Sequence, residues 1–285
     1  MKILVTGVNG QVGHALMREL AEHELIGITR QDCDLTNSDQ IRQVIDQHQP
    51  ELIINPAAYT KVDQAEDEPE LAFQINRDAP RVMAEKAREY NIPLIHFSTD
   101  YVFDGKKEDT YNENDKTNPL GVYGQSKLAG EDAIKELDGL YYIFRTSWVY
   151  SSIGRNFYLN IKRKILEQDE FKVVNDQLGV PTSSLFIAQQ IKKMIPKLLN
   201  ENRGIYHLVP NGACTWFDFA KLILNTSKPD QSEKKIIPVS SDLYPTKAKR
   251  PRNSCLANDK IQKALVLEFD DWKSVFLESL KNINE

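Results

Sequence analysis

Cysteine is scarce in this sequence of 285 residues, and long apolar runs are missing. Cys33, Cys214 and Cys255 are scattered and odd in number, which fits neither a disulfide framework nor a CxxC metal site. No stretch approaches the roughly 18 apolar residues of a membrane span, and the apolar segment after Met1 and Lys2 is too short for a signal-peptide core. We therefore expect a protein of a reducing compartment, the cytoplasm, with no membrane partner.

An excess of basic side chains is also missing. The 36 lysines and arginines against 41 aspartates and glutamates give a formal net charge of -5. Such a chain lacks the broad basic surface by which proteins bind nucleic acid, although the basic segment at residues 247–252 can still meet a small anionic ligand. The hydrophobic content of 41% and the charged content of 27% are ordinary for a folded protein, which excludes a disordered or collagen-like chain.

Strand-like and helix-like segments alternate up to about residue 150. Short β-branched runs predict buried strands at residues 3–5, 25–29, 52–54, 94–97 and 141–144. Helical spacing predicts helices at residues 11–23, 38–47 and 66–90, the last of them broken near residues 78–80 because of Pro80. This alternation predicts an α/β fold with a doubly wound parallel sheet of the Rossmann type.

The pattern loosens after residue 150, where turn-rich segments separate isolated helices. We expect residues 1–150 to form an NAD(P)-binding domain and residues 151–285 to form mainly a smaller substrate-binding lobe. Residues 171–174 and 205–208 are two further strand candidates, which could rejoin the main sheet.

A glycine-rich turn follows the first predicted strand. Gly7, Gly10 and Gly13 stand between a strand and a segment of helical spacing, which is the order that a dinucleotide site requires. Gly7 would permit the tight turn, Gly10 would let the backbone approach a pyrophosphate, and Gly13 would allow close packing of helix and strand. The spacing is GxxGxxG rather than GxGxxG.

The end of the second predicted strand bears on the choice of cofactor. An acidic residue there would bond the ribose 2′-hydroxyl of NAD, whereas Arg30 places a cation where a 2′-phosphate would lie. NADPH is therefore the favoured cofactor, unless Arg30 is only a solvated loop charge. Asp34 and Leu35 could cover the adenine, and the small residues Ala57 and Ala58 after the third strand suit close passage over the cofactor.

A tyrosine and a lysine one helical turn apart form the candidate catalytic pair. Tyr123 and Lys127 share one face of a predicted helix. Hydride transfer to a carbonyl needs a proton source, and a neighbouring ammonium is expected to lower the pKa of a tyrosine by stabilising its phenolate. Thr99 ends the preceding predicted strand and is the candidate for a further hydrogen bond to the substrate oxygen. The Tyr-x-x-x-Lys pair is ambiguous alone, but its order after the glycine turn and Thr99 predicts a reductase.

Three longer strings surround these residues: STDYVFDG at residues 98–105, VYGQSKLAGE at 122–131 and RTSWVY at 145–150. With them, nearly the whole chain resembles the extended short-chain dehydrogenase/reductase family, and within it the enzymes that act on dTDP-linked 4-keto-6-deoxysugars. The resemblance implies reduction of the C4 ketone of dTDP-4-dehydro-L-rhamnose to dTDP-L-rhamnose. It also implies NADPH as the hydride donor, with NADH as a possible second cofactor, and a monomer or homodimer.

The resemblance assigns roles to the catalytic residues and to the cofactor segments. It implies that Tyr123 donates the proton to O4, that Lys127 tunes Tyr123 and binds the nicotinamide ribose, and that Thr99 adjusts hydrogen bonding at the reacting oxygen. The positions that match the family's cofactor segments are Gly10, Gln11, Val12, Asp34, Leu35, Ala57, Ala58 and Tyr59.

The resemblance also points to residues for the substrate. Asp100 and Trp148 would contact the sugar, although Trp148 could equally be a core aromatic. Gln177, Arg250 and Asn253 would lie at the nucleotide end, where a guanidinium suits a diphosphate, although Arg250 could equally be a surface charge.

One position departs from the family pattern. Some members are described as dimers bridged by magnesium, with a glutamate two residues after the third glycine as a ligand. This chain has Ala15 there. We therefore expect no metal, and hydride transfer needs none.

Two other functions remain open. A nucleotide-sugar epimerase or dehydratase would recycle a retained NAD, but a dehydratase would favour a glutamate beside Thr99 and Asp100, and Arg30 favours NADPH. A non-catalytic NADP-binding regulatory subunit shares such folds. A regulatory subunit needs no proton donor with an adjusted pKa. Tyr123 and Lys127 predict such a donor, which favours an enzyme.

Overall fold

The computed structural model describes residues 1–198, 200–227 and 234–283. Within these residues the main sheet has six parallel strands in the order β10-β5-β4-β3-β1-β2. They are β1 (Lys2–Thr6), β2 (Glu24–Ile28), β3 (Leu52–Asn55), β4 (Leu94–Thr99), β5 (Tyr141–Thr146) and β10 (Gly204–His207). The predicted α/β class with a doubly wound parallel sheet is confirmed.

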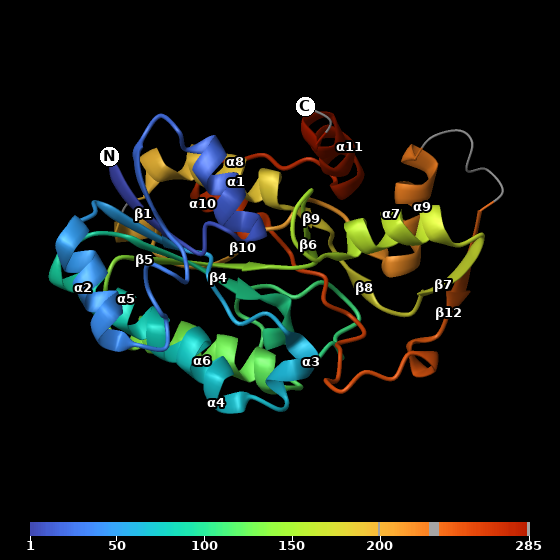
Figure 1. Cartoon of the computed structure of the whole chain (residues 1–285), viewed down its shortest axis with the longest axis horizontal. Helices are drawn as coiled ribbons and strands as arrows, with labels where there is room; N and C mark the ends of the chain where they lie inside the picture. The colour runs from blue at the N-terminus through green and yellow to red at the C-terminus, as the bar shows by residue number, and fades with distance from the viewer. Residues whose placement is uncertain (199, 228–233, 284–285) are drawn as a thin grey trace.

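Helices cover both faces of this sheet. In Figure 1, α1 (Gln11–Glu19), α8 (Ser184–Met194) and α10 (Asp259–Ala264) lie above the sheet, and α2 (Ser38–His48), α5 (Ala79–Glu89) and α6 (Val122–Glu136) lie below it. Alternate strand residues enter two separate apolar clusters: Ile3 and Val5 of β1 pack with the first group of helices, and Leu4 packs with the second. Burial on both faces explains why the strands read as continuous apolar runs.

The strand order reverses at β1, because β2 lies on one side of it and β3 on the other. In open α/β sheets, ligands bind beyond the carboxyl ends of the strands at such a point. The fold therefore directs attention to the residues that follow β1, β3 and β4.

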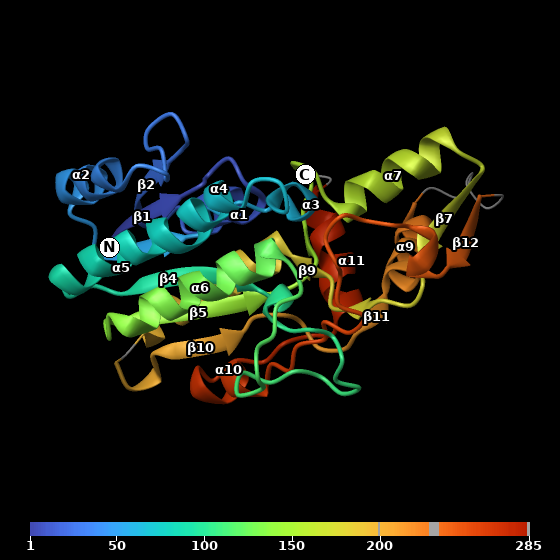
Figure 2. The same cartoon turned by 90° about the horizontal axis from the view of Figure 1, so that it is seen from below.

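A second lobe lies beside the carboxyl end of the sheet (Figure 2). Its apolar cluster is rich in aromatic side chains, among them Tyr150, Tyr158, Phe219 and Phe276. Its elements are α7 (Phe157–Glu167), α9 (Trp216–Thr226) and α11 (Trp272–Ile283), with the strand pairs β6 (Val149–Tyr150) with β9 (Thr182–Ser183), β7 (Glu170–Val174) with β12 (Lys235–Val239), and β8 (Leu178–Gly179) with β11 (Cys214–Thr215). Of the two further strand candidates, residues 171–174 form a strand that does not rejoin the main sheet, because β7 pairs with β12, whereas the segment at 205–208 joins it as β10.

The segment at residues 66–90 differs from the single broken helix that was expected. The short helices α3 (Val62–Ala65) and α4 (Pro69–Phe73) lead into a π-helical turn, Gln74–Asp78, and then directly into α5. The chain does not break at Pro80, because the proline lies in the first turn of α5, where its missing N–H leaves no hydrogen bond unmade.

None of the helices in the described ranges is long and apolar enough to cross a membrane.

Candidate active site

The turn between β1 and α1 brings the three predicted glycines together. Gly7 has a φ of +58°, and a Cβ there would lie 3.0 Å from the Cα of Ala57. A Cβ on Gly13 would clash with the carbonyl oxygen of Gly7. Helix α1 begins at Gln11 without a side-chain cap, so its first N–H groups and its dipole are available to an anion. This backbone cradle fits the pyrophosphate of a dinucleotide.

Gln11 and Val12 hold the turn in place. The Oε1 atom of Gln11 accepts hydrogen bonds from Ser151 Oγ at 2.9 Å and from Asn156 Nδ2 at 2.8 Å. Val12 packs against the apolar cluster above the sheet. Gln11 therefore connects the glycine turn to the loop that enters the second lobe.

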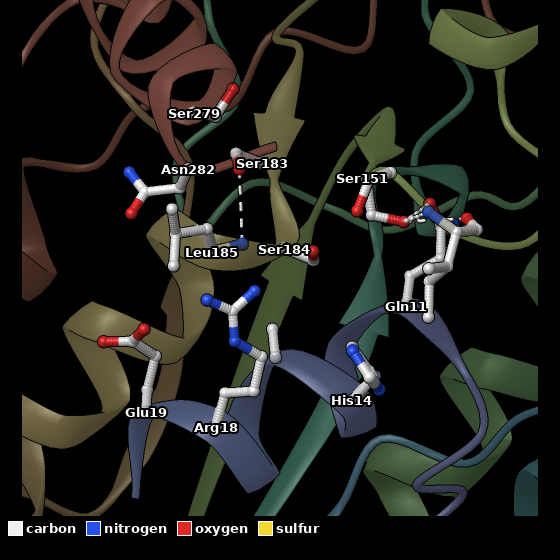
Figure 3. Close-up of a pocket in the computed structure, with 13 residues that line it drawn as sticks. Gln11, His14, Arg18, Glu19, Ser151, Ser183, Ser184, Leu185, Ser279 and Asn282 are labelled. Atoms are coloured by element: carbon white, nitrogen blue, oxygen red, sulfur yellow. Dashed lines mark hydrogen bonds between the residues drawn. The ribbon is translucent and has the colours of Figure 1, made fainter. Parts of the chain in front are cut away.

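A small pocket of about 40 Å³ lies on the outer side of α1. Figure 3 shows Arg18 of α1 pointing toward Leu185 of α8, with His14 further along α1 on the side of Gln11, and Ala15 is also part of the lining. Glu19 supplies the one carboxylate of the lining. In the described part of the chain, no group of three or more His, Cys, Asp or Glu side chains could hold a metal ion.

A second cavity, of about 200 Å³, opens where the chain leaves β1, β2 and β3. It gathers residues that the sequence had singled out for the cofactor: Gly7, Arg30, Asp34, Leu35, Ala57 and Ala58. Arg30 is exposed and forms none of the ion pairs found among the described residues. The carboxylate of Asp34 accepts from the backbone N–H and the hydroxyl of Thr36, both at 2.9 Å, and these bonds lower the pKa of Asp34.

Tyr59 faces a different environment from its neighbours Ala57 and Ala58. Its backbone exchanges two hydrogen bonds with the side chain of Asn76, which lies in the π-helical turn. Its hydroxyl donates to Glu68 at 2.7 Å, and burial and this partner raise the pKa of Tyr59 to about 12. Its ring packs in a small apolar cluster that also contacts Tyr123.

Tyr123 and Thr99 meet at the carboxyl end of β4. Tyr123 is in the first turn of α6, and its hydroxyl shares a hydrogen bond with the Thr99 side chain. Thr99 also donates to Asp100 Oδ1 at 2.9 Å and accepts from the backbone N–H of Tyr101 at 3.2 Å. Strand β4 and helix α6 thus bring together the predicted proton donor and its hydroxyl partner.

The pKa of Tyr123 does not follow the expectation. Burial raises it above its ordinary value, although the hydrogen bond from Thr99 acts in the opposite direction. The expected lowering by Lys127 was wrong for this conformation, because the ammonium is directed elsewhere: Nζ donates to the carbonyl oxygen of Phe97 at 2.6 Å and lies 3.2 Å from Nε2 of His96. Lys127 is itself buried, and burial lowers its pKa to about 8.

Asp100 is a buried carboxylate that adjoins Thr99. Burial raises its pKa to about 6, despite hydrogen bonds from Ser254 and Thr99. Its Oδ2 atom has no hydrogen-bond partner among the described residues. Because a buried acceptor without a partner is costly, this oxygen suits a hydroxyl group of a ligand.

A large cavity of about 780 Å³ lies in the second lobe. Gln177 and Arg250 line it, as does Trp216. Arg250 donates to the hydroxyl of Tyr101 at 3.0 Å and pairs with Asp63 at 2.8 Å. Further cations on the wall make the cavity suitable for a diphosphate: Lys164, Lys172, Lys249 and Arg252.

Trp148 contributes to this cavity indirectly. Its ring stacks on that of Trp216 with centroids 3.4 Å apart and planes 6° apart, so one half of the pair lines the cavity. The backbone of Trp148 has a φ of +47°, which a residue with a side chain rarely adopts. Gly179 makes the stack possible, because a Cβ at that position would clash with the Trp148 ring.

The structure does not bring Asn253 to the nucleotide end of the cavity, as had been expected. Its side-chain amide donates to the carbonyls of Lys107 at 2.8 Å and Asp109 at 3.0 Å, and its oxygen accepts from the backbone of Cys255 at 3.0 Å. In this structure these bonds occupy the side chain in holding a loop, and Asn253 does not line the cavity.

Sequence reasoning missed several residues of this region. Asn76, Asp63 and His96 gave no motif, and their contacts come from distant parts of the chain. Nothing in the sequence around Trp216 indicates its stack with Trp148.

Comparison with known proteins connects the chain to named relatives. A family model described as RmlD substrate binding domain matches residues 1–285. The dTDP-4-dehydrorhamnose reductase of Escherichia coli K12 is 40% identical over 283 residues, which is 96% of this chain and 95% of that protein. A crystal structure of such a reductase from Clostridium acetobutylicum covers 100% of both chains with a TM-score of 0.93 and 35% identity. Another, from Bacillus anthracis in complex with NADP, has a TM-score of 0.91 and 36% identity, and covers 100% of this chain and 99% of that one.

Proposed function

This chain belongs to the dTDP-4-dehydrorhamnose reductase family, and from that premise we propose that it reduces the C4 ketone of dTDP-4-dehydro-L-rhamnose to dTDP-L-rhamnose with NADPH. The observation that supports this most is that contacts of Tyr123 lead to two of the cavities. The apolar cluster against which Tyr123 packs includes Ile75, which lines the 200 Å³ cavity. The ring of Tyr101 packs edge-on against that of Tyr123 with centroids 5.6 Å apart, and the Tyr101 hydroxyl accepts a hydrogen bond from Arg250, which lines the 780 Å³ cavity.

The cofactor would occupy the cavity beside the glycine turn. Gly10 and the first N–H groups of α1 would hold the pyrophosphate, and Arg30 would pair with the 2′-phosphate, which makes NADPH the preferred cofactor and NADH an alternative. When bound there, NADPH supplies the hydride that adds to C4 of the sugar. The remaining residues proposed for this site are Gly7, Gln11, Val12, Gly13, Asp34, Leu35, Ala57, Ala58 and Tyr59.

Tyr123 is proposed as the proton donor. As the C–H bond forms at C4, the C=O bond becomes C–O, and the Tyr123 hydroxyl gives its proton to O4. Thr99 shares a hydrogen bond with the Tyr123 hydroxyl, and its proton, which goes to Asp100 in this structure, would turn to O4 when the substrate is bound. In this structure the Lys127 ammonium contacts β4 and does not lower the pKa of Tyr123; with the cofactor bound, its remaining N–H would bind the nicotinamide ribose and its charge would stabilise the resulting phenolate.

Asp100, Trp148, Gln177 and Arg250 are proposed to bind the substrate. The Oδ2 atom of Asp100 would accept from a sugar hydroxyl, and the Trp148 ring, fixed against Trp216, would pack on the sugar. Gln177 and Arg250 would bind the nucleotide diphosphate with the neighbouring cations.

These positions divide cofactor binding and substrate binding between two parts of the chain. We propose residues 1–150 as the cofactor-binding domain and residues 151–285 as the main source of the substrate-binding lobe. The chain would work as a monomer or a homodimer. Three free, buried cysteines fit the reducing environment of the cytoplasm.

The test is NADPH oxidation by the purified chain against a panel of nucleotide 4-keto-sugars, with analysis of the product. We expect stoichiometric oxidation with the dTDP-linked 4-keto-6-deoxysugar of L-configuration and formation of dTDP-L-rhamnose. Tightly bound NAD without net NADPH consumption would instead indicate an epimerase or dehydratase. Binding of NADPH without turnover of any sugar in the panel would indicate a regulatory subunit.

A further inference from the structure

A row of polar side chains crosses three neighbouring strands and ends at Lys127. Thr6 ends β1, Asn55 ends β3, and His96 is the register partner of Asn55 in β4. The Thr6 hydroxyl donates to Asn55 Oδ1 at 2.6 Å, and Asn55 Nδ2 lies 3.1 Å from His96 Nδ1. Nε2 of the same ring lies 3.2 Å from Lys127 Nζ.

All four side chains are buried, with exposed fractions of 3%, 1%, 0% and 2% from Thr6 to Lys127. Buried polar groups destabilise the folded state unless they bond one another. Breaking any hydrogen bond of the row would leave a buried polar atom without a partner, which disfavours other arrangements of these side chains. Burial and the charge of Lys127 lower the pKa of His96 well below its usual value, so the ring is neutral. A neutral imidazole has one nitrogen free to accept a hydrogen bond.

We propose that His96 is a positioning residue for Lys127, which rests on the function proposed above. The ammonium has three N–H groups. One donates to the Phe97 carbonyl at 2.6 Å, and in the charged state a second would donate to His96 Nε2, which lies 3.2 Å away; this leaves the third for the bound ligands. His96 and Phe97 are consecutive residues of β4. A single strand therefore fixes the ammonium of Lys127, whose backbone lies in the same helix as Tyr123.

Asn55 can hydrogen-bond His96 both when Lys127 is charged and when it is neutral. When Lys127 is charged, His96 Nε2 accepts, the ring proton is on Nδ1, and the side-chain oxygen of Asn55 must receive it. When Lys127 is neutral, Nε2 carries the proton and donates to Nζ, and the Asn55 amide donates to Nδ1, which is the orientation seen here. The amide can rotate and the Thr6 hydroxyl can reverse with it, so the tautomer of His96 follows the charge of Lys127.

Few charged groups influence the pKa values of His96 and Lys127. Lys127 faces His96 from α6, and Glu131, also on α6, raises the pKa of Lys127. From β1 and β3 the partners are Thr6 and Asn55, which do not titrate. Loss of the His96 acceptor would therefore disfavour the ammonium and lower the pKa of Lys127, because no other group is placed to compensate among the described residues.

The test compares His96→Leu, which removes the acceptor, with His96→Gln, whose amide oxygen can replace Nε2. His207→Leu is the matched control: His207 is also 0% exposed, but it lies on β10 and bonds the Ala257 carbonyl at 3.0 Å. We expect His96→Leu to lower kcat by about tenfold to a hundredfold with little change in KM for the sugar. Its alkaline limb of kcat should move to lower pH by about one unit, since a bond to a charged group is lost. His96→Gln should restore most of the activity.

Two results would overturn the proposal: an equal loss of kcat in the folded His96→Leu and His207→Leu proteins, or an alkaline limb that does not move in His96→Leu. If the leucine variant does not fold, His96→Asn replaces it, because its amide reaches Asn55 but not Lys127; equal activity of the asparagine and glutamine variants would then count against the proposal. Nitrogen-15 NMR titration of the Lys127 side chain reads its pKa without turnover. That measurement separates failure of this proposal from failure of the proposed reductase activity.

Discussion

Arg250 donates a hydrogen bond from Nη1 to the hydroxyl of Tyr101 over 3.0 Å, although 149 residues separate the two in sequence. The ring of Tyr101 in turn meets the ring of Tyr123 edge-on. A residue on the wall of the cationic cavity is thus one side chain away from the proposed proton donor. This contact connects the wall of that cavity to the proposed proton donor.

Replacement of Arg250 by alanine should raise KM for the dTDP-sugar by at least about tenfold and change kcat little. A guanidinium that binds the diphosphate acts equally on the bound substrate and on the transition state, so its loss appears in KM. Steady-state kinetics with varied sugar would measure this. Arg81→Ala is the control, because that side chain is 54% exposed on α5 and pairs with Glu85 there. An unchanged KM in Arg250→Ala would show that Arg250 does not bind the substrate and only makes structural contacts with Tyr101 and Asp63.

Replacement of Tyr123 by phenylalanine should reduce kcat by at least about a hundredfold, the scale of a lost general acid, and leave NADPH binding nearly intact. The ring and its contacts remain, and the transferable proton is gone. Stopped-flow turnover and a fluorescence titration with NADPH would measure the two quantities. Tyr90→Phe, which removes a hydroxyl bonded to Asp46 on α2, should behave as the parent protein. Turnover near the parent rate in Tyr123→Phe would remove this residue from the mechanism.

Replacement of Arg30 by alanine should raise KM for NADPH by about tenfold or more and KM for NADH by less than about twofold. The 2′-phosphate is the group that distinguishes the two cofactors, and a cation acts on it directly. Arg81→Ala tests for a general effect of charge, because Arg81 is 54% exposed on α5. Equal weakening of both cofactors would show that Arg30 does not contact the 2′-phosphate.

Replacement of Gly13 by alanine should lower the free energy of unfolding by about 1–3 kcal/mol and weaken NADPH binding, because the added Cβ would meet the backbone of Gly7 and Val8. Gly139→Ala is the matched control: the nearest atom to its Cβ would be Arg88 Cβ at 3.6 Å, an ordinary contact. Urea unfolding with and without NADPH would compare the two variants. Equal stability and equal affinity would contradict the close approach described for this turn.

Asp100 predicts a pH dependence of stability. Its pKa is about 6 in the folded protein against an ordinary value of 3.8, so between these values the folded state holds the proton and the unfolded state has lost it. The free energy of unfolding contributed by this group therefore falls as pH rises, by about 3 kcal/mol across a shift of about two units.

Asp100→Asn cannot titrate, so its stability relative to the parent should increase by about that amount between pH 4 and pH 7. Urea unfolding across this range would measure the difference, with Glu136→Gln as an exposed control on α6. Parallel stability curves for Asp100→Asn and the parent would show that Asp100 does not keep its proton in the folded protein.

Local patterns in the sequence were sufficient for the strands, the glycine turn and the order of the catalytic residues. Buried parallel strands require continuous apolar runs, and a turn that approaches a helix as closely as Gly13 approaches Gly7 requires glycine, so both leave marks within a few residues. The same holds for Tyr123 and Lys127, which share one helix face. Their roles in catalysis stay predictions.

What the sequence alone could not determine depends on contacts between distant segments. The direction of the Lys127 ammonium is one example: it is decided by His96 and the Phe97 carbonyl on β4, and this orientation is why the expected effect on Tyr123 was wrong. Asn253 is another, because three carbonyls of residues 107–109 occupy its amide. The pairing of β7 with β12 is a third, since apolar alternation gives a strand its faces but not its neighbour.

The sequence by itself determined the α/β class, the nucleotide-binding turn and the presence of a tyrosine-lysine pair, because periodicity and turn chemistry act between residues that are close along the chain. Only the tertiary structure decided which way the lysine points, which polar side chains stand behind it, and where Arg250 and Trp148 find their partners. The physical reason is that a buried polar or aromatic side chain takes its orientation from whichever groups the completed fold places around it.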